Sequence, residues 1–304
     1  MRYVHSTLFH VQWLLQVLLT GLFCLSDWGS TTQAVLCGAL LCTVGIPHGA
    51  NDHAYRPNTT SVGLLGFLGV YLGSMGAYLA LWWSAPALAL LLFFAISLHH
   101  FGQSNFENRS VWYLPSLLWG AWVLVFPVLL HWDEAMGIFG AMVGSGVSWE
   151  KSASGLSGMW RGLAALLLAL FYLLALLRLE REQWTRYLLQ WGVVSVWYWL
   201  TPLLFGFIVV FCVWHSLQSL QHQLRHFQSA GGGSRRQFFL GLLPFGLLAL
   251  AGFGGYVYFR GFAVDEAFVL LSLITLPHVV VMHRLYGAPA SPTSPTTASG
   301  KRAV

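Results

Sequence analysis

The sequence predicts an all-α fold, a polytopic bundle of about eight to ten transmembrane helices. Of its 304 residues, 57% are hydrophobic and only 8% are charged, whereas soluble proteins have roughly 45–50% apolar and about 25% charged residues. Apolar runs of about 20 residues, the length that crosses a bilayer, recur along almost the whole chain. Charged residues stand at the ends of these runs, where orienting residues of membrane proteins are found. This composition excludes a soluble globular protein.

The predicted spans follow one another closely from the N-terminus. The first run follows Arg2 and is succeeded directly by further runs, so we expect a helix there and not a cleaved signal peptide. The stretch 134–160 is too broken for a span, and we interpret it as an outer or re-entrant segment. Residues 1–286 are expected to form one membrane-embedded helical domain, and 287–304 a disordered cytoplasmic tail. The ten candidate spans are 8–25, 33–53, 62–84, 86–106, 111–131, 161–178, 187–202, 203–226, 237–258 and 267–286.

The basic residues indicate how the bundle is oriented. If the N-terminus is cytoplasmic, twelve of the fifteen Lys and Arg residues fall at the inner ends of the spans, which is the positive-inside pattern. We therefore expect an integral protein of the cell (inner) membrane with both termini in the cytoplasm. Because these residues are scattered over helix ends, they predict no nucleic-acid partner. The twelve residues are Arg2, Arg56, Arg109, Arg178, Arg181, Arg186, Arg225, Arg235, Arg236, Arg284, Lys301 and Arg302.

Histidines gather at the inner ends of four even-numbered spans. Most of the twelve histidines lie inside spans, where ionisable groups are costly and by default indicate a functional site. Neutral imidazole is a common ligand of iron, zinc and copper, so several imidazoles that converge in a dry bundle favour a bound metal. The four segments are Ile46-Pro47-His48-Gly49-Ala50-Asn51-Asp52-His53, His99-His100-Phe101-Gly102-Gln103-Ser104-Asn105, Trp214-His215 up to His226, and Leu276-Pro277-His278 with His283.

Spacing limits which of these histidines can share one ion. His215, Ser219, His222 and His226 lie on one face of a helix, but this stripe is about 16 Å long. One ion could use His215, or the pair His222 and His226, but not both sets. The alternatives remain open on spacing alone.

The first histidine motif carries a second constraint. His48 and His53 are five residues apart, roughly 140° around a helix, so both can face one site only if Gly49 breaks the helix. Asp52 could orient a ligating imidazole through its second ring nitrogen. The motif therefore offers His48, with His53 as a second donor if the helix ends there.

Three of these segments together resemble the Brp/Blh family of membrane β-carotene 15,15′-dioxygenases, which supply retinal to microbial rhodopsins. The likeness runs from about residue 33 to 286 and rests on the order and spacing of 45–53, 100–102 and 214–217. It implies that His48, His100 and His215 are catalytic and hold a non-haem Fe(II). It also implies O2 and β-carotene, or another apolar polyene, as reactants within the lipid bilayer. An iron held by neutral imidazoles keeps open positions for O2, as an oxygenase requires.

The chain departs from the family pattern at two positions. The family usually has a second histidine four residues after the one that matches His215, and Ser219 stands there. It also tends to have an acidic residue where Asn105 stands. We expect His222 to supply the fourth ligand, with His53 next, and His226 and His278 as further candidates. Alternatively, His222 and His226 are the true match and His215 is a neighbour, or the chain has another substrate or no oxygenase activity.

Two other functions use the same histidines. A di-iron lipid or carotenoid desaturase or hydroxylase would account for the excess of histidines, although the usual His-x3-His pairs are lacking except 222/226. A non-enzymatic metal or small-molecule transporter would use them as a pathway, and it predicts polar residues on both membrane halves. The outer half is nearly devoid of them, which argues against a transporter.

Overall fold

The computed structural model describes residues 2–55, 63–107, 110–144, 158–231 and 233–287. Within these ranges the chain forms helices and no strand, which confirms the predicted all-α bundle. The expected tail 287–304 lies outside the described residues except for Gly287, and so does 145–157 of the broken stretch.

The described part of the chain has eight helical runs that are long and apolar enough to cross a membrane, or nine if a bent pair counts as one span. This agrees with the predicted range. In chain order the elements are α1 (Arg2–Leu25), α2 (Ser30–Leu40), η1 (Leu41–Gly45), η2 (Pro47–Gly49), η3 (Asp52–Tyr55), α3 (Leu64–Ser84), α4 (Pro86–Phe106), α5 (Leu114–Leu130), α6 (Trp132–Val143), α8 (Gly158–Leu176), α9 (Arg181–Leu200), α10 (Leu203–Val210), η4 (Phe211–Ser216), α11 (Leu217–Ser229), α12 (Arg235–Arg260) and α13 (Val264–Gly287).

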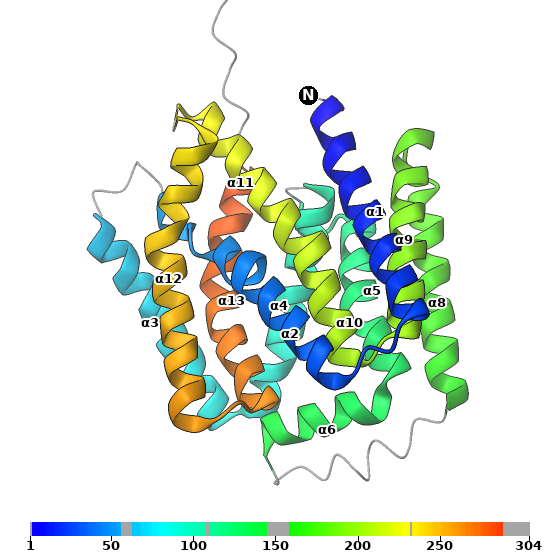
Figure 1. The fold of residues 1–304 in the computed structure, drawn as a ribbon, viewed down its shortest axis with the longest axis horizontal. Helices are drawn as coiled ribbons and strands as arrows, with labels where there is room; N and C mark the ends of the chain where they lie inside the picture. Colours follow the sequence, from blue (N-terminus) through cyan, green and yellow to red (C-terminus); the bar gives the residue numbers. More distant parts are fainter. Residues whose placement is uncertain (1, 56–62, 108–109, 145–157, 232, 288–304) are drawn as a thin grey trace, which may run out of the picture.

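Two segments differ from a simple series of spans. Helix α9 covers the predicted span 187–202, but it carries Arg181, Glu182 and Arg186 and does not qualify as a span by composition. Helices α5 and α6 together form the bent pair, with an angle of 103° at His131. As a result α6 lies across the ends of α4, α5 and α13 (Figure 1).

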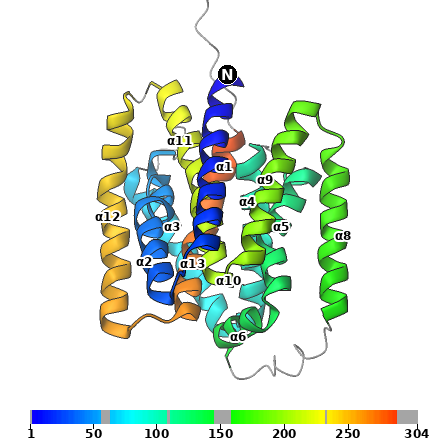
Figure 2. The ribbon, with the colours of Figure 1, turned by 45° about the vertical axis from the view of Figure 1, so that its right-hand side comes forward.

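The helices run up and down between two ends of the bundle. The end that holds the N-terminus and the connection from α11 to α12 is called the inner end here, and the end covered by α6 the outer end (Figure 1). The basic residues of the α8–α9 and α11–α12 connections lie at the inner end. Figure 2 shows α12 and α8 at opposite edges of the bundle, with α10 and α13 between them.

Helices α4 and α5 make the most extensive contact among the elements that the structure describes. A Cβ atom on Gly102 would lie 1.9 Å from the backbone oxygen of Ser116, and one on Gly120 would lie 1.9 Å from that of Leu98. Glycine at such crossings lets two backbones approach directly, as is common between helices in membranes. Since His100 lies between Leu98 and Gly102, this contact fixes the part of α4 that carries the histidine motif.

Candidate active site

Four buried imidazoles form a closed ring in the inner half of the bundle. They are His48 of η2, His100 of α4, His215 of η4 and His278 of α13. Their ring centroids are 5.3 Å apart for 48 and 215, 4.7 Å for 100 and 215, 5.0 Å for 100 and 278, and 5.0 Å for 48 and 278. Each side chain is buried, and His100 is only 1% exposed. The four spans that carry histidine motifs therefore do converge, as their order along the chain predicts.

Two of these histidines are placed by irregular helix. The helix that begins with α2 passes through the π-helical turn η1 and ends in the 3-10 turn η2, which carries His48. His215 lies in the second π-helical turn, η4, between α10 and α11. A π turn leaves backbone carbonyls without their usual partners and is frequent at functional sites. The side-chain amide of Gln12, on α1, donates to the carbonyl of Val213 in η4 at 2.6 Å.

Hydrogen bonds hold the ring tautomers of His48 and His215. Nδ1 of His48 donates to the backbone oxygen of Gly45. Nδ1 of His215 lies 2.9 Å from Oγ of Ser104, whose hydroxyl donates in turn to the carbonyl of Phe101. Because Ser104 already donates elsewhere, it accepts from His215, and Nε2 of both histidines keeps its lone pair.

His278 is held by a carboxylate. Its Nδ1 donates to both carboxylate oxygens of Asp52 at 2.9 Å, and the hydroxyl of Tyr71 donates to Oδ2 of the same carboxylate at 2.9 Å. Nε2 of His278 is buried and has no hydrogen-bond partner. A carboxylate on the second nitrogen is the usual support of a metal-ligating histidine.

His100 is the member of the ring whose two nitrogen atoms lack hydrogen-bond partners. Both of its ring nitrogens are buried without a hydrogen-bond partner, and an unpaired buried polar group costs about 1–3 kcal/mol. With a metal–nitrogen bond of about 2.1 Å, ring centroids around one ion would be roughly 4.6–5.3 Å apart, as they are here. The four residues therefore fit a metal ion.

The side chains as they stand do not yet form a coordination sphere. Among the residues that the structure describes, no group of three or more His, Cys, Asp or Glu side chains is arranged so that it could hold a metal ion. A bound ion would therefore require the imidazoles to turn from the orientations that they have here.

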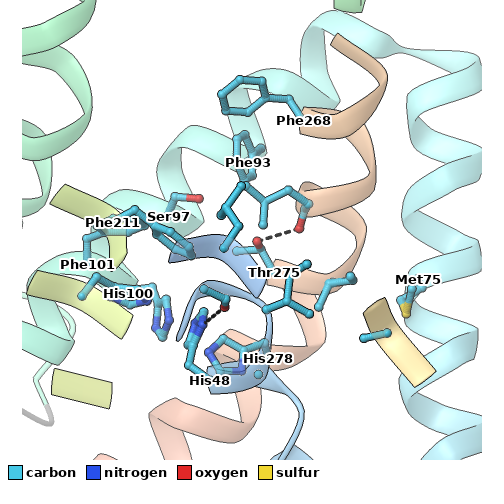
Figure 3. A pocket seen from close by; sticks show the side chains of 18 of the residues that line it. His48, Met75, Phe93, Ser97, His100, Phe101, Phe211, Phe268, Thr275 and His278 are labelled. Atoms are coloured by element: carbon cyan, nitrogen blue, oxygen red, sulfur yellow. Dashed lines mark hydrogen bonds between the residues drawn. The ribbon is translucent and has the colours of Figure 1, made fainter. Parts of the chain in front are cut away.

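A cavity of about 500 Å³ lies against the ring of imidazoles. All four histidines line it, and the rest of its wall is almost entirely aliphatic and aromatic. Figure 3 shows Phe93 and Phe268 on one side of His48, His100 and His278, and Met75 on another. Such a volume is typical of a small-molecule site, and the apolar wall suits a ligand without polar groups.

The cavity opens between α3 and α12. Leu72 of α3 and Leu248 of α12 line it, although their side chains are 60% and 66% exposed. In a membrane-spanning bundle, side chains exposed at this depth face lipid. An apolar ligand can therefore pass between bilayer and cavity without crossing water.

Two other predicted metal ligands lie apart from the ring. His53 lines the cavity, but its ring packs at 4.2 Å from that of Phe245 on α12. His222 packs at 4.5 Å from the ring of Tyr286, and its Nδ1 is 3.6 Å from a carboxylate oxygen of Glu107. His222 does not line the cavity.

The residues at the two departures from the family pattern are buried and have structural partners. Ser219 is 0% exposed and accepts a hydrogen bond of 3.3 Å from Gln223, which also donates to the carbonyl of His48 at 2.8 Å. Asn105 accepts a hydrogen bond of 2.8 Å from Gln190 of α9.

Sequence reasoning did not single out several residues that support the ring. Ser104 lies one helical turn after His100, and Tyr71 is one of several aromatic residues in its span. Gln12 offered the clearest signal, since an amide in an apolar span is costly unless it has a partner.

Comparison with known proteins shows to which family the chain belongs. The family model described as beta-carotene 15,15′-dioxygenase matches residues 39–286. The chain belongs to the beta-carotene 15,15′-dioxygenase family. Among curated relatives of this family, the beta-carotene 15,15′-dioxygenase of uncultured marine bacterium 66A03 is 24% identical over 277 residues, which cover 82% of this chain and 92% of the relative. The probable beta-carotene 15,15′-dioxygenase Blh of Halobacterium salinarum is 28% identical over 278 residues, which cover 78% and 80%.

Membership in the beta-carotene 15,15′-dioxygenase family confirms the predicted resemblance and the assignment as an oxygenase. This membership argues against the alternative function as a non-enzymatic transporter. No solved structure matches the chain significantly. The long apolar helices of the described residues indicate that the chain is an integral membrane protein.

Proposed function

We propose that this protein cleaves β-carotene, or a closely related carotenoid, at the central double bond to form retinal, with an Fe(II) held by His48, His100, His215 and His278. The ring of four imidazoles at the edge of an apolar cavity carries this proposal. The names of the two relatives support the substrate. In place of His222, His278 supplies the fourth nitrogen, since it closes the ring and Asp52 supports it.

The reaction balances without a further reductant. The central carbon–carbon double bond and the O–O bond both break, and each of the two carbons receives one oxygen atom. When bound, the iron would supply the activation of O2. Gly45, Ser104 and Asp52 keep the protons on Nδ1 of their histidines, so that the Nε2 lone pairs stay available for a metal ion. The apolar wall holds the polyene and excludes water.

The decisive experiment is an assay of the purified protein. In detergent, with β-carotene and O2, we expect close to two molecules of retinal for each carotene consumed and about one iron per chain. With ¹⁸O2, both retinal molecules formed from one β-carotene should carry the label in their carbonyl groups, provided that they are isolated before the aldehyde exchanges with water. A desaturated or hydroxylated carotenoid in place of retinal, with iron near two per chain, would support the desaturase alternative instead.

We further propose that the protein lies in the cell (inner) membrane and that the inner end of the bundle faces the cytoplasm. The basic residues of the α8–α9 and α11–α12 connections lie at this end, and Arg260 lies at the other. A reporter fused to the C-terminus should be active when it is of the type that works in the cytoplasm and inactive when it is of the type that works outside. The reverse pattern would contradict this topology.

A further inference from the structure

The cavity extends from the imidazoles toward the outer end of the bundle. On α4 its wall runs from His100 to Leu90, and on α13 from His278 to Phe268. Each pair is ten residues apart, which corresponds to about 15 Å along a helix. Between these ends the lining is apolar except for the hydroxyls of Ser97 and Thr275, the latter donating to the carbonyl of Leu271 at 2.8 Å. This part of the cavity is called the closed arm below.

Helix α6 closes the far end of this arm. Ile138, Phe139 and Met142 of α6 line it, and Met142 is only 9% exposed. Behind them a hydrophobic cluster fills the space between α3, α4, α6 and α13. Its buried members are Tyr78, Trp82, Ala89, Leu90, Met142, Val143 and Leu273.

Hydrogen bonds lock the cluster behind the arm. The hydroxyl of Tyr78 donates to the carbonyl of Ala89 at 2.7 Å, and the indole nitrogen of Trp82 donates to Oγ of Ser272 at 2.8 Å. Both bonds tie α3 to a neighbouring helix. The end of the arm is therefore a packed wall, unlike the opening between α3 and α12.

We propose that the closed arm measures one half of the substrate and thereby selects the double bond that lies beside the four histidines. This inference rests on the proposed function. An extended chain advances about 1.2 Å per bond, so the twelve bonds from a central carbon of β-carotene to the far carbon of its ring span about 14 Å. With the radius of the terminal atoms, this half fills an arm of about 15 Å.

The opposite half of the substrate does not need a matching wall. It lies toward the opening between α3 and α12, where Leu72 and Leu248 are exposed. A substrate seated one double bond too shallow would leave about 2.5 Å of the closed arm empty and lose the dispersion contacts of its terminal ring. The closed arm thus favours one seating, and the other end of the polyene is free to vary.

The test shortens the arm from its end. Met142→Trp adds bulk where the ring of the substrate would rest, and Ala141→Trp places the same bulk on the adjacent, exposed position of α6. With β-carotene, we expect Met142→Trp to move cleavage by one double bond, giving fragments of 22 and 18 carbons, with kcat/KM several-fold lower. Ala141→Trp should still give retinal at the wild-type rate.

Binding without O2 separates this inference from the proposed function. Each protein is incubated anaerobically with β-carotene, and the carotenoid that remains bound after gel filtration is measured by its visible absorption. If Met142→Trp binds β-carotene several-fold more weakly than the wild type does, and Ala141→Trp does not, the closed arm is supported as a binding site. This holds even if the wild type proves to cleave nothing. Unchanged binding, or central cleavage by Met142→Trp at the wild-type rate, overturns the inference.

Discussion

The His278→Ala variant is expected to lose nearly all bound iron and at least about 100-fold of its retinal formation, since even residues that only support metal ligands are worth about 10–100-fold. Truncation removes the nitrogen that closes the ring of imidazoles. It also leaves the buried carboxylate of Asp52 with the hydroxyl of Tyr71 as its hydrogen-bond partner among the residues that the structure describes. Iron per chain, measured by elemental mass spectrometry on protein that elutes as a single species, is the primary readout.

His222→Ala is the matched control, because the sequence alone favours His222 as the fourth ligand. In the structure its ring packs on Tyr286 near Glu107, outside the cavity. We expect this variant to keep its iron and most of its activity. Loss of iron from His222→Ala together with its retention in His278→Ala would assign the fourth position to α11.

Replacing Gly102 or Gly120 by alanine should prevent the bundle from assembling. The added methyl group would lie 1.9 Å from a backbone oxygen of the facing helix, so α4 and α5 would have to separate along their whole contact. Overpacking commonly costs 1–3 kcal/mol, and we expect more than about 3 kcal/mol here because backbone must move. The measurement is the melting temperature in detergent together with the yield of monodisperse protein.

Gly73→Ala provides the comparison for these variants. Gly73 lies in the transmembrane helix α3 with nothing within 4 Å of the position of its added methyl group. It should behave as the wild type does. A stable, iron-loaded Gly102→Ala protein would show that α4 and α5 can separate without disturbing His100.

Much of the fold and part of the candidate site could be predicted from the sequence. The bilayer imposes one length on every span, so apolar runs mark helices without knowledge of their neighbours. Because spans alternate in direction, the motifs at 48, 100, 215 and 278 had to reach the same half of the bundle. Helix α9 is harder to classify, since its polar residues face other helices in places, as Gln190 does toward Asn105.

The choice of the fourth imidazole could not be predicted, because it depends on rotation of helices about their axes. A uniform helix places His222 on the face of His215, but η4 departs from uniform geometry at Phe211–Ser216. His278 faces the site because α13 packs on α3 and α4 and because Asp52 reaches it across 226 positions of sequence. The cavity likewise depends on side chains from many helices and leaves no local pattern.

The π-helical turn at Phe211–Ser216 also has a genetic consequence. Such a turn holds one more residue than the α-helix on either side of it. Loss of a single codon within it would restore a regular helix, so the backbone at His215 would no longer bulge, whereas the segments on either side would keep their relative orientation. The membrane topology and the composition of the protein would hardly change, while His215 would leave the ring. Inactive alleles of this gene could thus arise from in-frame deletions that spare both expression and membrane insertion.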